Sequence, residues 1–184
     1  MKLLFWLLWL LVLTGCTMTP APSSEPTPAA PTPQTTQVAI QNPITAEQKS
    51  QLQYLIQEEK LARDVYMMMD EARSIRKFAN ILTAEDNHQN RVAQILEVYK
   101  IDNPIIWLNR GDFVDPELTQ LYDDLVAQWL TSSDQAIQVG IIIERKDIAD
   151  IQAMLPWFSN NPDITAMLQA LLAGSQNHLA AFQK

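Results

Sequence analysis

The chain contains a single cysteine, Cys16, among its 184 residues. One cysteine excludes an intrachain disulfide, and because Cys16 lies near the N-terminus, the rest of the chain has no thiolate to offer a metal ion. Basic residues are also scarce. Thirteen lysines and arginines face 21 aspartates and glutamates, which gives a net charge of −8. Nucleic acid is therefore not an expected partner, since its phosphates would be repelled.

The apolar run at the N-terminus is too short to cross a membrane. It follows Lys2 and covers the ten residues 3–12, whereas a spanning helix needs about 20 residues. The run ends in LTGC, at Cys16, and this motif resembles the lipobox of bacterial lipoproteins. We therefore expect residues 1–16 to be a signal peptide, with Cys16 as the residue that accepts the lipid.

Proline is concentrated directly after this segment. Seven of the eleven prolines fall between Pro20 and Pro43, among threonine, alanine, serine and glutamine. Such a composition cannot bury a core and favours extended conformers. We expect residues 17–44 to be a disordered tether and residues 45–184 to be the folded domain.

From residue 45 onward the sequence shows helical periodicity and almost no strand signal. The expected helices are a long one opened by a Thr45–Gln48 capping box, a second over about 77–99, a shorter one opened by Asp115 and Pro116, a third long one capped by Ser133, and a last one opened by Asn161 and Pro162. Four long amphipathic helices with a long connection after the second predict an all-α, antiparallel four-helix bundle with one crossover, which carries the short extra helix.

Polar residues interrupt the apolar stripe of every long helix. They stand where leucine or isoleucine is expected, and a buried carboxylate is costly unless it is paired or binds a metal. Both histidines of the chain belong to this set. The candidate metal ligands are Glu59, Glu85, His88, Glu144, Asp147 and His178. Tyr66 and Tyr99 flank the set on the same stripes and are candidates for redox-active or supporting residues, although core tyrosines are common.

Two pairs in this set have the spacing of a single helix face. Glu85 and His88 are three residues apart, as are Glu144 and Asp147, so each pair can reach one cation. Four carboxylates and two imidazoles suit iron or manganese. We expect two metal ions, which are iron, manganese or a mixture of the two, and no organic cofactor.

Five segments resemble known families of helical metal proteins. EEKLARDVY is similar to the Glu-x-x-Ala-Arg-x-x-Tyr pattern of rubrerythrin-like helices, whose glutamate binds metal, and this selects Glu59 over Glu58. Together with AEDNH, GDFVDPELTQLYDDLV, VGIIIERKDIADI and GSQNHLAAF, it resembles the uncharacterised ferritin-like family known as domain of unknown function 2202, over about residues 50–183. The resemblance implies a ferritin-like fold and a metal centre, and no known substrate.

The set departs from the usual di-iron arrangement at one position. In that arrangement two helices each supply a glutamate and two each supply Glu-x-x-His, but here Ser175 stands three residues before His178. Asp147 can supply the missing carboxylate as a ligand, or it can support the ligands without touching metal. For His178 to be a ligand rather than a neighbour, its helix must begin about 10 Å beyond the end of the preceding helix.

The sequence thus predicts a metal protein that oxidises Fe(II) or reduces peroxide or dioxygen at a di-iron centre. The alternative is a non-catalytic metal-binding or scaffolding lipoprotein that engages an envelope partner.

Thr17 follows Cys16, at the position where an aspartate would retain a lipoprotein at the inner membrane. This predicts a lipid-anchored protein of the bacterial cell envelope, at the periplasmic face of the outer membrane in a Gram-negative cell. Besides the membrane and metal ions, the sequence leaves a homodimer open.

Overall fold

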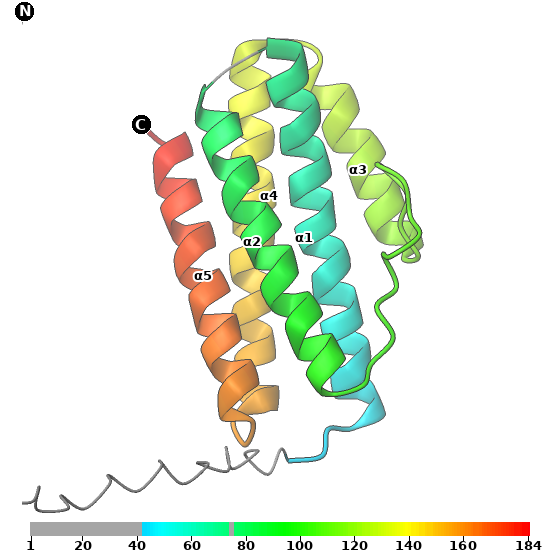
Figure 1. The fold of residues 1–184 in the computed structure, drawn as a ribbon. Coiled ribbons are helices and arrows are strands. Elements are labelled where there is room, and N and C mark those ends of the chain that lie inside the picture. The colour runs from blue at the N-terminus through cyan, green and yellow to red at the C-terminus, as the bar shows by residue number, and fades with distance from the viewer. Residues whose placement is uncertain (1–41, 74–75) are drawn as a thin grey trace, which may run out of the picture. The chain divides into compact units, whose positions relative to one another are not determined.

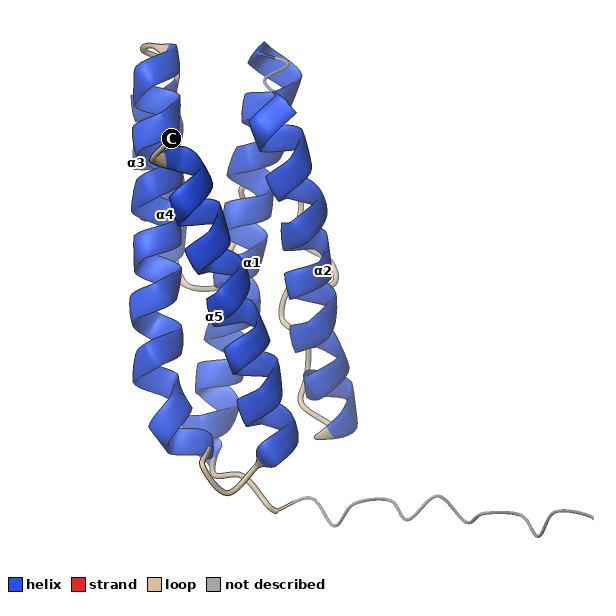
Figure 2. Cartoon of the chain, turned by 90° about the vertical axis from the view of Figure 1, so that its left-hand side faces the viewer, coloured by secondary structure: helices blue, strands red, loops and turns tan. Residues whose placement is uncertain are grey.

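The computed structural model describes residues 42–73 and 76–184, and the regular structure of these residues is entirely helical (Figures 1 and 2). Its helices are α1 (Ala46–Arg73), α2 (Arg76–Val98), α3 (Pro116–Trp129), α4 (Ser133–Met154), the short 3-10 helix η1 (Leu155–Phe158) and α5 (Pro162–Phe182). The prediction of an all-α fold is confirmed. The predicted signal peptide with Cys16, and the predicted tether up to residue 41, lie outside the described residues.

The four long helices run side by side, and α3 lies against one side of them (Figure 1). α1 packs along α2, α4 packs along α5, and α3 contacts both α4 and α1. In Figure 1, α1 and α5 run upward while α2 and α4 run downward, so the segment between α2 and α4 returns along the length of these helices. Within the described part of the chain, no helix is both long and apolar enough to cross a membrane.

Two of the predicted helix caps are confirmed. The Thr45 N–H donates to Gln48 Oε1 at 2.7 Å, and the Gln48 N–H donates to Thr45 Oγ1 at 3.2 Å, so these two residues form a reciprocal capping box for α1. Asp115 caps α3 through Oδ1, which accepts from the N–H groups of Glu117 and Leu118. Each cap supplies acceptors to N–H groups that have no partner within the helix.

The predicted cap of α4 is wrong by one residue. Ser132, not Ser133, has the extended backbone of an N-cap, and its Oγ accepts from the Gln135 N–H at 3.1 Å. The two serines are adjacent, and a preference for serine at the cap cannot separate them. Ser133 is therefore the first residue of the helix.

The start of α5 is confirmed at Pro162, but Asn161 does not cap it through its side chain. The Asn161 amide instead donates to the carbonyl oxygen of Asn42 at 2.9 Å and to the Tyr99 hydroxyl at 3.2 Å. Asn161 thus links the start of α5 to the residue that follows α2 and to the segment before α1.

The apolar core is divided into two clusters, and the buried glutamates and histidines of the candidate site lie between them on the long helices. One cluster contains Tyr66 and Phe78, and the other contains Leu52 and Phe158. On α1 the second cluster ends at Ile56 and the first begins at Leu61, so Glu59 falls between them. On α2, α4 and α5 the candidate ligands likewise fall between residues of the two clusters. Apolar packing on both sides therefore fixes a polar layer across the four long helices.

The connection between α2 and α3 is held to polar side chains of α1. Gln57 Oε1 accepts from the N–H groups of Val114 and Asp115 at 2.8 and 3.0 Å. Asp64 Oδ2 accepts from the N–H of Gly111 at 3.0 Å, and this glycine has a φ of 80°, which glycine adopts without a steric cost. Gln57 and Asp64 are thus buried to dock the crossover.

Candidate metal centre

Glu59 of α1 converges with Glu85 and His88 of α2 in the polar layer. His88 Nδ1 lies 3.2 Å from Glu85 Oε2 and 3.4 Å from Glu59 Oε2. All three side chains are buried, and their ligand atoms lie within 4.8 Å of one another. This group could hold one metal ion.

A second group joins Glu85 to Glu144 of α4 and His178 of α5. His178 Nδ1 lies 2.9 Å from Glu85 Oε1 and 3.5 Å from Glu144 Oε2. Although these atoms are close, His178 Nδ1 is buried without an aligned hydrogen bond, so it and the two oxygens face a shared space. Glu85 belongs to both groups and turns one oxygen toward each histidine. The rings of His88 and His178 stack with their centroids 5.5 Å apart.

His178 reaches the cluster because η1 extends the helical chain beyond the end of α4 before α5 begins. The 3-10 helix continues directly from α4 over four residues, and at about 2.0 Å per residue it adds about 8 Å. This is close to the offset of about 10 Å that the depth of His178 in its helix requires. The structure therefore brings His178 together with Glu59, Glu85, His88 and Glu144.

Asp147 lies beside both groups without belonging to either. Ser175 Oγ donates to Asp147 Oδ2, while Asp147 Oδ1 is buried and has no hydrogen-bond partner. Burial raises the pKa of Asp147 to about 7, and the charges of Glu85 and Glu144 act in the same direction. The serine that stands in place of a second Glu-x-x-His glutamate thus orients a carboxylate supplied by α4.

Tyr66 contacts the cluster, whereas Tyr99 does not. The Tyr66 hydroxyl donates to Glu144 Oε1 at 2.6 Å. Burial raises the pKa of Tyr66 well above its usual value, and the negative charge of Glu144 adds to the effect. The Tyr99 hydroxyl instead donates to Asp163 Oδ1 at 2.9 Å, near the start of α5. The geometry leaves Tyr66 as the tyrosine that can influence a bound metal.

Protonated histidines balance the buried carboxylates when no metal is bound. Burial alone would lower the histidine pKa values, but the adjacent, negatively charged glutamates raise the pKa of His88 to about 10 and that of His178 to about 9. Burial would raise the pKa of Glu85, yet the two histidines bring it down to about 2. Burial raises the pKa of Glu59 well above its usual value. Two buried positive charges thus occupy the layer where metal cations would bind.

Gly174 allows α5 to approach His88, and this gives a first prediction. A methyl group at Gly174 would lie 2.3 Å from His88 Nε2. Glycine to alanine in a helix interior normally stabilises by about 1 kcal/mol. Here we expect Gly174→Ala to displace the His88 ring and weaken metal binding by about tenfold. Competition with a chelator measures the affinity, with Gln176→Ala on the exposed face of α5 as the control. Unchanged affinity together with a higher thermal midpoint would contradict this reading.

These observations define an all-α protein with a buried carboxylate–histidine cluster that could bind metal. Residues 48–184 match the family described as "Uncharacterized protein domain (DUF2202)". The chain belongs to this family, and the predicted membership is confirmed.

The similar proteins carry no functional name. The chain is 37% identical over 142 residues to "Uncharacterized protein MJ0754" of Methanocaldococcus jannaschii, which covers 76% of this chain and 75% of that protein. The crystal structure of hypothetical protein MJ0754 from Methanococcus jannaschii DSM 2661 is similar with a TM-score of 0.74, over 77% of this chain and 80% of that chain. The comparisons therefore support the family and the fold, and function has to be argued from the site.

Proposed function

We propose that the cluster holds two metal ions, iron in the first instance, and that the protein is a ferritin-like four-helix bundle that oxidises Fe(II) or reduces peroxide or dioxygen. The observation that carries this proposal is the position of Glu85. One of its oxygens lies near His88 and the other near His178. Glu85 thus belongs to two groups, each of which contains one further glutamate and one histidine. A carboxylate shared between two such groups is the arrangement expected for a pair of bridged ions in a helical bundle.

The donor atoms suit such ions. Carboxylate oxygens and imidazole nitrogens favour iron or manganese over softer metals. Glu59 Oε1 and His178 Nδ1 are buried and have no hydrogen-bond partner. Buried polar atoms are normally satisfied, and a cation would satisfy both. When bound, the ions would supply redox chemistry and a coordination position for the oxidant.

The chain's own residues would prepare the site in distinct ways. His88 and His178 would bind through Nδ1, the nitrogen that each turns toward the glutamates. Tyr66 fixes the orientation of Glu144 through its hydroxyl, which keeps its proton. Asp147 lies beside the cluster, and its Oδ1 has no hydrogen-bond partner. The apolar clusters on either side exclude water, which strengthens the electrostatic interactions inside the layer.

Anaerobic loading with Fe(II), followed by dioxygen or hydrogen peroxide, tests this proposal. We expect about two ions per chain and an absorption change on adding an oxidant, since each group adds its own glutamate and histidine to the shared Glu85. His88→Ala should remove most of the binding and all oxidation. His178→Ala should leave about one ion per chain, also without oxidation. A single bound zinc ion that is inert to both oxidants would instead support a non-catalytic role.

A non-catalytic scaffold is the second candidate, and one surface feature favours it. The Trp107 side chain in the crossover is 92% exposed, and its neighbour Ile106 is 59% exposed. Exposed large apolar residues are a common feature of interaction surfaces. Loss of a partner in Trp107→Ala with full metal content retained would favour this candidate over the oxidoreductase.

The envelope anchor belongs to the proposal as well. If Cys16 accepts a lipid, Cys16→Ser should leave the precursor uncleaved and without fatty acid, whereas the wild-type chain incorporates labelled fatty acid. Equal incorporation by both chains would contradict the lipoprotein prediction.

A further inference from the structure

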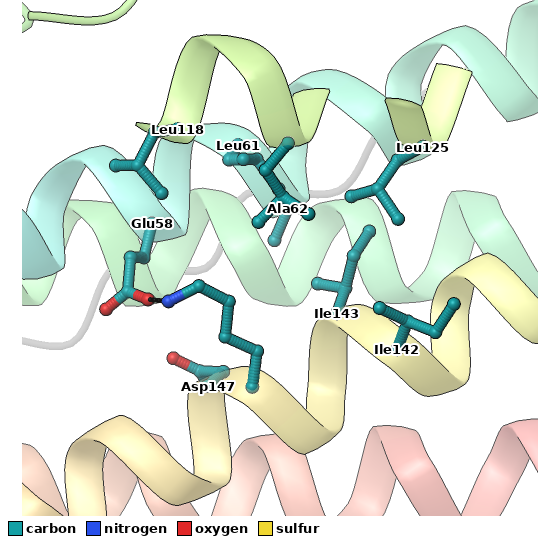
Figure 3. Close-up of a pocket in the computed structure, with 10 residues that line it drawn as sticks. Glu58, Leu61, Ala62, Leu118, Leu125, Ile142, Ile143 and Asp147 are labelled. Carbon is teal, nitrogen blue, oxygen red and sulfur yellow. Dashed lines mark hydrogen bonds and ion pairs between the residues drawn. The ribbon is translucent and has the colours of Figure 1, made fainter. Parts of the chain in front are cut away.

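A small pocket lies between α1, α3 and α4, and its ends differ in polarity. Leucine, isoleucine and alanine side chains from the three helices form most of its wall, and the polar lining residues are Glu58, Lys146 and Asp147. Figure 3 shows Glu58 and Asp147 at one end and the apolar side chains of Leu125 and Ile142 toward the other. Lys146 Nζ pairs with Glu58 Oε1 at 2.5 Å, so the charges at the polar end are partly balanced.

The pocket borders the candidate metal centre through residues next to its ligands. Ala62 lies one helical turn after Glu59 on α1, and Ile143 directly precedes Glu144 on α4. Asp147 lines the pocket and also interacts electrostatically with the glutamates of the cluster. Its Oδ1 is buried and has no hydrogen-bond partner. The pocket therefore lies beside the turns of α1 and α4 that carry Glu59 and Glu144.

Size and polarity restrict what the pocket can hold. Its cavity volume is about 20 Å³, slightly more than one water-sized sphere. An organic substrate is too large for this space. In the apolar part of the pocket, water and hydrogen peroxide would lose hydrogen bonds against the leucine and isoleucine walls, whereas a small apolar molecule has none to lose. Cavities with apolar walls accordingly stay dry and take up apolar gases.

We propose that this pocket binds a small apolar molecule of the dioxygen class and delivers it to the Asp147 side of the metal centre. The proposed route passes Ala62 of α1 and Ile143 of α4, which line the pocket. The inference rests on the proposed function and deepens it, because it selects dioxygen over peroxide as the oxidant that the fold admits by this route.

Xenon is the probe that tests the pocket without any metal chemistry. Crystals of the protein under xenon pressure should show xenon between Ala62 and Ile143. Ala62→Val adds two carbons to this wall and should remove the xenon. Leu121→Phe, at a half-buried position of α3, is a second blocking variant in case the first does not fold. Ala93→Val, also half-buried but on α2 and outside the pocket, is the matched control and should retain the xenon.

Kinetics then test delivery. With Fe(II) loaded anaerobically, Ala62→Val should lower the second-order rate constant for oxidation by dioxygen about tenfold. Its metal content and its rate with hydrogen peroxide should match those of Ala93→Val. Absence of xenon from the wild-type pocket would overturn the inference, as would an unchanged dioxygen rate in a variant that has lost xenon. A wild-type protein that binds xenon but is inert to both oxidants would contradict the proposed function itself, and delivery with it.

Discussion

Glu85→Gln is expected to abolish the binding of both metal ions, with a loss of affinity greater than about 100-fold at each position. An amide carries no negative charge, and Glu85 is the carboxylate that both groups share. Substituting it therefore removes a ligand from each group at once. Elemental analysis after equilibration with Fe(II) measures the loss.

The matched control for this variant is Glu97→Gln, on an exposed turn of the same helix. The metal-free Glu85→Gln protein also loses its ion pairs to His88 and His178. Its thermal midpoint therefore changes for reasons other than the loss of metal binding. The increase in stability on adding metal is the better measure. For each site, free metal at about 100 times the Kd adds about 2.7 kcal/mol. Retention of that increase in Glu85→Gln would show that metal binds elsewhere.

Metal binding is expected to release about two protons per chain from the histidines at neutral pH. The pKa values of His88, about 10, and His178, about 9, leave both rings protonated in the metal-free protein. A protonated imidazolium must lose a proton before its nitrogen can bind metal. The affinity for each ion should therefore rise about tenfold per pH unit until the pH passes the pKa of its histidine. Titration calorimetry in two buffers of different ionisation enthalpy counts all the protons released, to which Asp147, with a pKa of about 7, also contributes.

The same pKa values determine how the metal-free protein responds to pH. Both histidines have folded pKa values above the ordinary 6.5, so their contribution to stability is fully present below about pH 6.5. It should be lost as the pH rises through 9 and 10. His178→Gln should release one proton fewer on binding metal and lose the part of this pH dependence that belongs to His178. Binding without proton release would mean that the rings are neutral or do not bind metal.

The sequence predicted the cluster well because burial and spacing act together. Glu59, Glu85, His88, Glu144 and His178 each stand at a stripe position where an apolar residue is expected, and the structure brings all five together. Helical periodicity determines which face a residue occupies. Periodicity does not determine how far along the bundle a residue lies relative to residues of another helix. The position of His178 therefore depended on η1.

The remaining details depend on contacts between helices that lie far apart in sequence. The role of Ser175 is visible only once α4 places Asp147 against it, and Gly174 is understood only from its distance to His88. Tyr99 shares a stripe with the candidate ligands of α2, yet it lies near the helix end and bonds to Asp163. Gln57 and Asp64 accept from backbone N–H groups of the crossover, and the spacing of residues along α1 gives no sign of these contacts.

Anomalous diffraction at the iron absorption edge, from crystals of the protein grown with Fe(II) under anaerobic conditions, tests the central claim most directly. The account predicts two anomalous peaks. One should lie among Glu59, Glu85 and His88, and the other among Glu85, Glu144 and His178, with Glu85 between the two peaks. A single peak away from Glu85, or no peak while the chain is folded, would contradict the assignment of a di-metal centre.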